Sequence, residues 1–407
     1  MQGTMEQIKG GVCAAKGFRA NGVHCGIRKN KSKKDLALIV SDVRAATACV
    51  YTQNLVKGAP ILVTQKNVAD GYAQAAVVNS GNANTCNEDG IEIAEGMAEL
   101  VERHTGIPRS DVIVASTGVI GQRLSLEPIA AGMGELAQGL GDSSAEAALA
   151  IMTTDTVPKE TAYSFELDGK ECRIGAICKG VGMICPNMAT MLMFITTDVS
   201  ITPEMLQRAL SRDIADSLNM LSVDRDTSTN DMACVMANGL AGNATIRADG
   251  ASFRKFREAL HAVTVCMCRK IARDGEGATK LIECDVAGAR TKRCARLVAK
   301  SVVCSNLLKA AMFGADANWG RVLCAVGYSG ADVDVDRIAV RFRSAAGTVA
   351  VCENGRGIDF SEEEAKKVLS EDEIHIDINL NDGKQGATAW GCDLTYDYVK
   401  INGDYRT

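Results

Sequence analysis

Strand-like and helix-like segments alternate along the whole chain, and this alternation limits the possible folds more than any other feature of the sequence. Short apolar runs, Ala75-Ala-Val-Val78 and Val112-Ile-Val-Ala115, end in polar stretches, Asn79-Ser-Gly-Asn-Ala-Asn84 and Ser116-Thr-Gly118. Runs of this kind are typical of buried strands that lead into loops. The alternation therefore predicts a mixed α/β (α+β) fold class.

Two helices and one strand have clear sequence signals. Thr202 is suited to a helix N-cap and Pro203 to the first helical position, and an apolar residue then recurs every fourth position, at Leu206, Leu210, Ile214 and Leu218. A capping box, Ser361-Glu-Glu-Glu364, predicts the start of a second helix. Alternation of apolar and polar residues over 374–380 predicts a half-buried strand.

Composition excludes several classes of protein. The 407 residues are 46% hydrophobic and carry a formal charge of −5, so neither disorder nor a globally basic nucleic-acid binder is expected. The length suggests two or three domains, or one large intertwined unit. No apolar run is long enough for a membrane span, and the start of the chain lacks a secretory signal. We therefore expect a cytoplasmic protein.

The sixteen cysteines are scattered, no Cys-x-x-Cys pair occurs, and only four histidines are present. Disulfide scaffolds belong to short secreted chains, and zinc sites usually show paired cysteines. We therefore expect free, mostly buried thiols in a reducing compartment, with no metal site and no cofactor.

The most unusual segment starts at Lys179 and joins a glycine-rich turn, a Pro-Asn kink and an apolar strand that begins at Thr190. If the Thr190 hydroxyl attacked the carbonyl of Ala189, an N→O acyl shift and hydrolysis would cut the chain there. The new α-amine of Thr190 would then lie beside its own hydroxyl, where it can act as general base. Taken alone, however, a glycine-rich loop followed by a strand is more often purely structural.

Besides the segment around Thr190, short distinctive motifs occur along the whole chain. They include Gly10-Gly-Val-Cys-Ala-Ala-Lys-Gly-Phe18, Lys33-Lys-Asp-Leu-Ala-Leu-Ile39, Asn79-Ser-Gly-Asn-Ala-Asn84, Ser116-Thr-Gly-Val-Ile-Gly121, Ser222-Val-Asp-Arg-Asp-Thr-Ser-Thr-Asn-Asp231, Arg273-Asp-Gly-Glu-Gly-Ala278 and Gly314-Ala-Asp-Ala-Asn-Trp-Gly-Arg321. Because these motifs occur together and in this order, the chain resembles the ornithine acetyltransferase (glutamate N-acetyltransferase) family of arginine biosynthesis.

The resemblance implies a precursor that cuts itself between Ala189 and Thr190 into an α chain, 1–189, and a β chain, 190–407. Thr190 would take an acetyl group from N2-acetyl-L-ornithine as an ester and pass it to L-glutamate in a ping-pong exchange. The fold implied is a layered α-β-β-α-type sandwich like that of self-processing aminopeptidases. The implied assembly is a heterotetramer of two α and two β chains.

The resemblance also assigns the remaining site residues. Thr117, through its hydroxyl, and Gly118, through its backbone N–H, match the family's oxyanion pair. Glu276 matches a catalytic and substrate-binding position, where its carboxylate would orient the substrate amine or help move protons. The other substrate-binding positions are Thr153, Lys179, Asn402 and Thr407, and the last two predict that the C-terminal tail folds back into the cleft.

Some alternatives stay open at this point. A self-processing amidase or aminopeptidase of the same fold would use water in place of glutamate. Acetyl-CoA is a second possible donor, which would make the protein bifunctional as an amino-acid N-acetyltransferase. Cys185, five residues before Thr190, is a conceivable competing nucleophile. The residues 224–231 superficially resemble a calcium loop, but Thr229 replaces the turn glycine, so we expect a polar loop near the cleft.

Overall fold

The computed structural model describes residues 5–185 and 191–403, and in this part of the chain the strands form two sheets, one of nine strands and one of seven. The larger sheet has the order β1-β6-β7-β8-β10-β3-β4-β5, with β2 also paired to β3. Its strands are β1 (Glu6–Ile8), β2 (Phe18–Val23), β3 (Leu36–Tyr51), β4 (Tyr72–Asn82), β5 (Val112–Val119), β6 (Lys159–Leu167), β7 (Lys170–Lys179), β8 (Leu192–Thr197) and β10 (Met232–Ala237).

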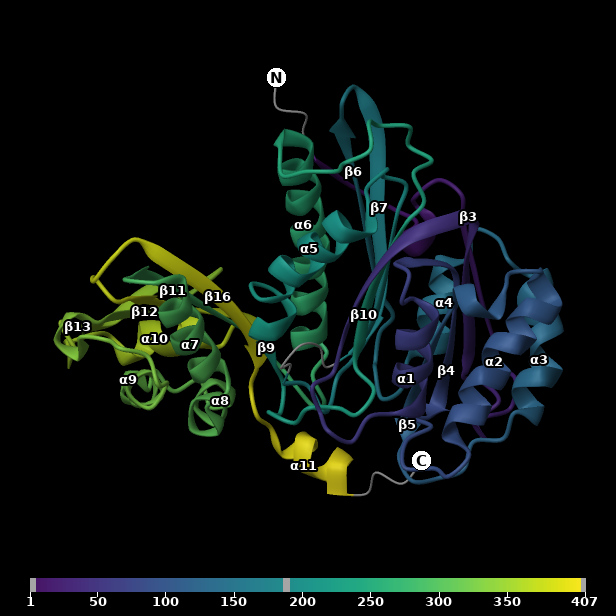
Figure 1. Cartoon of the computed structure of the whole chain (residues 1–407). Coiled ribbons are helices and arrows are strands. Elements are labelled where there is room, and N and C mark those ends of the chain that lie inside the picture. Colours follow the sequence, from purple (N-terminus) through teal and green to yellow (C-terminus); the bar gives the residue numbers. More distant parts are fainter. Residues whose placement is uncertain (1–4, 186–190, 404–407) are drawn as a thin grey trace.

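The larger sheet carries helices on both faces. α5 and the long α6 pack on one face of its centre, α4 packs on the other, and α2 and α3 cover the β3–β4–β5 end (Figure 1). The helices are α1 (Ala59–Asn67), α2 (Gly90–Thr105), α3 (Glu127–Gln138), α4 (Ser144–Ile151), α5 (Pro203–Ile214) and α6 (Ala251–Arg273).

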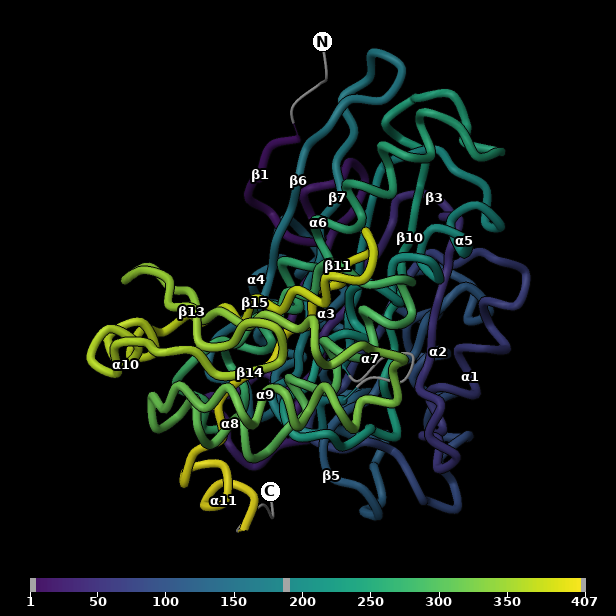
Figure 2. The backbone as a smooth tube through the Cα atoms, turned by 90° about the vertical axis from the view of Figure 1, so that its left-hand side faces the viewer, coloured from purple at the N-terminus to yellow at the C-terminus, as the bar shows by residue number. Residues whose placement is uncertain are grey.

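The seven-stranded sheet, with the order β14-β13-β12-β15-β11-β16-β9, forms a smaller lobe at the left of Figure 1, and Figure 2 looks onto this lobe. Its strands are β9 (Leu221–Ser222), β11 (Leu281–Ala289), β12 (Ala339–Ser344), β13 (Gly347–Glu353), β14 (Arg356–Gly357), β15 (Glu373–Asn379) and β16 (Gln385–Cys392). The remaining helices are α7 (Lys292–Val303), α8 (Asn306–Phe313), α9 (Trp319–Gly327), α10 (Glu362–Leu369) and α11 (Tyr396–Gly403).

The helix α6 joins the two sheets into one molecule. It contacts β6 and β7 of the larger sheet and β11 and β16 of the smaller one. Phe253 and Phe256 on this helix are fully buried in a core that contains residues of both sheets. The expected α/β class, with two sheets covered by helices, is confirmed.

The cysteines also follow the expectation. All sixteen lie in the described residues, each is a free thiol, and nine are buried. No helix in the described part of the chain is long and apolar enough to cross a membrane.

The local sequence signals are largely confirmed. The Thr202 hydroxyl accepts the Met205 N–H at the start of α5, and the Ser361 hydroxyl accepts the Glu364 N–H at the start of α10. The helix α5 ends earlier than its periodicity predicts, because Leu218 begins a separate 3-10 helix. The Ser217 hydroxyl donates to the backbone oxygen and carboxylate of Asp213 there.

Two predicted loops are strand instead. β4 continues through Asn82 and β5 through Val119, because their parallel ladder extends to the pairs Ser80–Thr117 and Gly81–Gly118. The buried Asn79 amide donates to the Ser116 hydroxyl at 2.8 Å. Backbone pairing across the ladder and side-chain hydrogen bonds such as this one allow the stretch to be buried although its residues are of the loop-forming type.

We predict that Phe256→Ala lowers the free energy of unfolding by about 3–5 kcal/mol, since it leaves a cavity where α6 meets both sheets. Urea unfolding of the purified protein measures this change. Lys255→Ala, on the exposed side of the same helix, is the control and should change the value by about 0.5 kcal/mol or less. Equal effects of the two substitutions would contradict a core role for this face of α6.

Candidate active site

A cavity of about 140 Å³ opens where β5, β7, β8 and β10 end or begin, and it collects most of the predicted site residues that the structure describes. Its lining includes Thr117, Gly118, Thr153, Lys179, Glu276 and Asn402. It also includes residues that were not predicted as site residues: Thr154, Ser228, Thr229, Asn230 and Asp231. Ala189, Thr190 and Thr407 lie outside the described residues. Met191 and Leu192, which follow Thr190 in the sequence, line the cavity.

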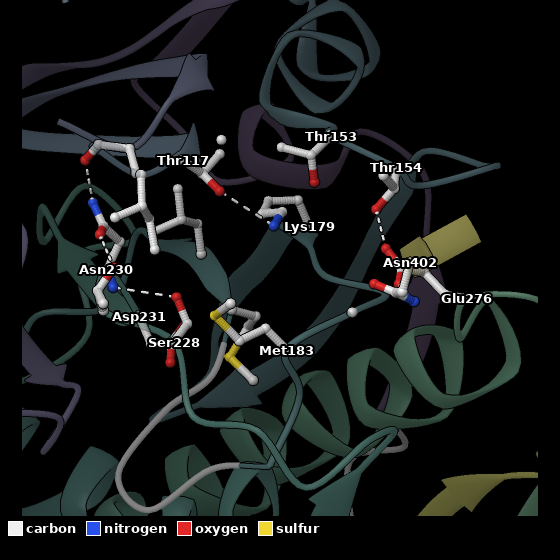
Figure 3. A pocket seen from close by; sticks show the side chains of 17 residues that line it. Thr117, Thr153, Thr154, Lys179, Met183, Ser228, Asn230, Asp231, Glu276 and Asn402 are labelled. Carbon is white, nitrogen blue, oxygen red and sulfur yellow. Dashed lines mark hydrogen bonds between the residues drawn. The ribbon is translucent and has the colours of Figure 1, made fainter. Parts of the chain in front are cut away.

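Thr117 and Gly118 come from the end of β5. Gly118 has a φ of +133°, and a Cβ placed there would lie 2.3 Å from the Gly81 carbonyl carbon on β4, so only glycine fits. The Lys179 ammonium, at the end of β7, donates to the Thr117 Oγ at 3.3 Å. Figure 3 shows Lys179 between Thr117 and Thr153 at the centre of the cavity.

Glu276 lies in the loop between α6 and β11, and both of its carboxylate oxygens are held. Oε1 accepts the Thr154 hydroxyl and Oε2 accepts the Asn402 amide, each at 2.7 Å (Figure 3). A Cβ on Gly182 would come within 2.5 Å of this carboxylate, so the glycine leaves room for it. Asn402 belongs to α11 and lines the cavity.

A buried ion pair behind the cavity fixes several of these segments. Lys159, which is fully buried, pairs with Asp155 at 2.7 Å and also with Asp274. Asp155 in turn accepts the backbone N–H groups of Thr153 and Gly180, each at 2.9 Å. Thr153 and the residue after Lys179 are therefore attached to one carboxylate.

Burial and charge shift the pKa values of these groups in opposite directions. Burial would raise the pKa of Asp155, but the ammonium groups of Lys159 and Lys179 outweigh it, and the pKa is lowered. Burial lowers the pKa of Lys179, which the carboxylates of Asp155 and Asp231 oppose. Burial raises the pKa of Asp231 well above its usual value, against the effect of Lys179. Several ionisable groups in and behind the cavity thus have pKa values shifted from their ordinary ones, as is common at functional sites.

The residues 228–231 form the polar loop near the cleft that the sequence predicted. Their individual roles could not be predicted from the sequence, because serine, threonine and asparagine in a loop are more often turn formers than ligands. The role of Thr154 could not be predicted for the same reason, although its neighbour Thr153 was a predicted site residue.

Cys185, the possible competing nucleophile, is not among the described residues that line the cavity. A hydrogen bond with Cys304 lowers the pKa of Cys185 to about 6, and the nearby Lys300 ammonium acts in the same direction. Its reactive form is thus stabilised by groups that also lie outside the cavity lining.

Comparison with known proteins gives a consistent result. The sequence model of the ArgJ family matches residues 19–407. The "Arginine biosynthesis bifunctional protein ArgJ 1" of Clostridium acetobutylicum is 51% identical over 392 residues, 96% of each chain. The ArgJ bifunctional protein of Caldanaerobacter subterraneus is 50% identical over 405 residues, 99% of this chain and 100% of that one. A crystal structure of ArgJ from Bacillus halodurans, 46% identical, covers 52% of this chain and 98% of its own, with a TM-score of 0.50.

We predict that Asp155→Asn lowers the free energy of unfolding by about 3–5 kcal/mol near pH 7, because it removes one of the two carboxylates that neutralise the buried Lys159. Since the folded-state pKa of Asp155 lies below its unfolded value, its contribution is complete above the unfolded pKa and is lost as the pH falls through the folded one. The difference between wild type and variant should therefore shrink below about pH 4.

Urea unfolding at a series of pH values measures this difference. Asp70→Asn is the matched control, because Asp70 pairs with Arg44 at the surface and should contribute about 1 kcal/mol or less. A difference for Asp155→Asn that stays constant down to pH 2 would refute the ionic origin of the effect.

Proposed function

Because the chain belongs to the ArgJ family, we propose that it moves an acetyl group from N2-acetyl-L-ornithine to L-glutamate through an ester on Thr190. Family membership confirms the resemblance read from the sequence, and the chain is a bifunctional acetyltransferase of arginine biosynthesis. The observation that carries the finer proposal is the cavity itself. It brings Thr117, Gly118, Lys179 and Glu276 together around Met191, the residue that follows Thr190.

The reaction divides one amide exchange into two acyl transfers. In the first, the Thr190 oxygen attacks the acetamide carbon of N-acetylornithine, the C–N bond breaks, and ornithine leaves. In the second, the glutamate nitrogen attacks the acetyl ester and releases the Thr190 oxygen. The α-amine of Thr190, once freed by cleavage, is the base that takes the proton of its own hydroxyl.

Each transfer passes through a tetrahedral oxyanion, which needs donors fixed in advance. Thr117 suits this role because its oxygen already accepts a hydrogen bond from Lys179. A hydroxyl has one hydrogen, and that hydrogen remains for an acceptor in the cavity. The N–H of Gly118, the next residue of the strand, is the second donor.

The substrate side of the proposal rests on the charges of the cavity. Lys179 is suited to an α-carboxylate, with Thr153 beside it as a further donor (Figure 3). Glu276 is held on both oxygens, so it presents a fixed negative charge toward the substrate amine. Asn402 fixes Glu276 and closes this end of the cavity, and Thr407 is the remaining binding residue of the proposal.

Self-cleavage at Ala189–Thr190 is supported by two observations. The match to the ArgJ crystal structure from Bacillus halodurans covers 98% of that chain but only 52% of the present one. The matched chain thus corresponds to about half of the present chain, which is the length expected of one cleavage product. In addition, β8 lies between β7 and β10 and is hydrogen-bonded to both. The α chain, 1–189, and the β chain, 190–407, would therefore stay joined in one sheet. We extend the proposal to paired αβ protomers in the cytoplasm and to acetyl-CoA as second donor.

A first test concerns the cut. Denaturing mass spectrometry of freshly expressed protein should show two fragments that meet at Ala189 and Thr190. Thr190→Ala removes the nucleophile, so the variant should remain a single 43.0 kDa chain without transferase activity. Cys185→Ala is the control and should be cut as in the wild type. Cleavage of the Thr190→Ala chain would disprove the nucleophile.

A second test concerns the intermediate. Incubation of cleaved protein with N-acetylornithine alone should add one acetyl mass to the β chain, because the acetyl ester has no acceptor until glutamate arrives. Rapid quench and mass spectrometry detect the adduct, and later addition of glutamate should yield N-acetylglutamate. Release of free acetate at the same rate with and without glutamate would instead favour the amidase alternative.

A further inference from the structure

Asp231 is a buried carboxyl group in the wall of this cavity. It directly precedes β10, and its side chain is among the lining residues although the residue is only 3% exposed. Its backbone is fixed on two sides. The Asp231 carbonyl accepts the Thr52 N–H from beyond the end of β3, and the next N–H, of Met232, donates to the carbonyl of Met191. The position of the carboxyl is therefore set by the ladder that also positions Met191.

One oxygen of this carboxyl is unoccupied. The hydroxyl and backbone N–H of Ser228 favour the ionised form of the Asp231 carboxyl, whereas Oδ2 has no hydrogen-bond partner among the described residues. Buried polar atoms are rarely left in this state. Glu276, the other carboxylate that lines the cavity, has a donor on each oxygen. Oδ2 of Asp231 is therefore an unpartnered carboxyl oxygen in the cavity wall, a donor when the group is protonated and an acceptor when it is ionised.

The surroundings of Asp231 decide how it holds a proton. Among the described residues, the charged side chain that acts on it is Lys179, from β7. The Asp231 backbone lies between Thr52, just beyond β3, and Met191, just before β8. Lys179 is itself balanced by Asp155 and Glu276. Burial favours the neutral carboxyl, and Lys179 favours the ionised one. Two opposing influences therefore act on the proton of Asp231, and burial is the larger of the two.

The proposed reaction moves two protons to or from the substrate nitrogen in each transfer, and the Thr190 hydroxyl accounts for only one of them. The acetamide nitrogen of N-acetylornithine carries one hydrogen, and to leave as an ammonium it must gain two. The Thr190 hydroxyl supplies one of them. Glutamate enters as an ammonium and must lose two protons before its nitrogen becomes an amide, and the Thr190 oxygen takes back one. A second group must give and recover the other proton.

We propose that Asp231 is the acid–base partner of the substrate amine. This inference rests on the proposed function. In the first transfer, Oδ2 gives its proton to the ornithine nitrogen as the C–N bond of the acetamide breaks. In the second, it takes a proton from the glutamate ammonium as the new C–N bond to the acetyl group forms. The carboxyl ends each full cycle protonated as it began, and Glu276 serves to orient the amine.

Asp231→Asn is the decisive variant, because asparagine keeps the shape and the contact with Ser228 but cannot exchange a proton. We expect each half-reaction, followed by rapid quench and mass spectrometry, to slow by about 10²–10⁴-fold. Asp198→Asn is the matched control. Asp198 is fully buried, its pKa is also raised by burial, and it directly follows β8, at the far end of the parallel β8–β10 pair from Asp231. It should leave both rates unchanged.

The pH dependence separates acid–base action from mere positioning. In the wild type, acetylation by N-acetylornithine should slow as the pH rises through the pKa of Asp231, and transfer to glutamate should slow as the pH falls through it. Both dependences should disappear in Asp231→Asn. Ser228→Ala removes a hydroxyl group that favours the ionised carboxyl, so it should move both midpoints to higher pH.

Wild-type pH profiles that persist in a cleaved Asp231→Asn variant would overturn the proposal, as would wild-type rates in that variant. Should the variant remain uncleaved, Ser228→Ala decides, and unshifted midpoints would overturn the inference. The wild type is measured in parallel. If the wild type forms no acetylated β chain, the proposed function itself fails. If the wild type is acetylated but Asp231→Asn changes neither the rates nor the pH profiles, only this inference is refuted.

Discussion

The buried Lys159 ammonium is the constraint on which the site depends. It lies at the start of β6, has no contact with water, and is neutralised by Asp155 and Asp274. Asp155 fixes the backbone of Thr153 and of Gly180, next to Lys179, and Asp274 lies two residues before Glu276. One cation thus ties together three segments that are far apart in the sequence. An unpaired charge at this depth is costly, so the three segments are held in their relative positions by the same requirement that keeps the fold intact.

The larger sheet explains how a chain cut near its middle would keep a single site. The strand β8 begins at Leu192, shortly after the undescribed residues 186–190, and pairs antiparallel with β7, which precedes them. The strand β10, which follows them, pairs antiparallel with β3, which precedes them. The backbone hydrogen bonds of these two ladders would hold the two products together, and α6 adds contacts to β6 and β7. The cavity lies at this seam, where Lys179 ends β7 and Asp231 precedes β10. A new chain end produced there would be created inside the site that uses it.

The parts of this arrangement that the sequence predicts are those governed by local chemistry. Thr202 and Ser361 cap their helices because a hydroxyl at those positions satisfies a free N–H, whatever the surroundings. The extension of β5 through Thr117 was not predictable in this way, because polar residues enter a buried strand only when a neighbouring strand supplies partners. Glu276 and Asn402 were assigned from the resemblance, but their mutual hydrogen bond is a tertiary contact that no spacing indicates. Asp231 was in a recognised segment, and only its burial distinguishes it from the other acids there.

The two carboxyl groups of the cavity differ in environment, and this difference suits them to different tasks. Both oxygens of Glu276 accept a hydrogen bond, from Thr154 and from Asn402, and this fixes the position of the carboxylate. A carboxylate held in this way can attract and orient a cation. Asp231 is buried with one oxygen open, which favours the neutral form and leaves a site for exchange. A reaction that replaces one amine with another needs both a fixed charge to bind the amine and a movable proton to change its state. In this cavity Glu276 has a hydrogen-bond donor on each oxygen, and Asp231 has one oxygen without a partner. The two carboxyl groups are thus suited to these two tasks.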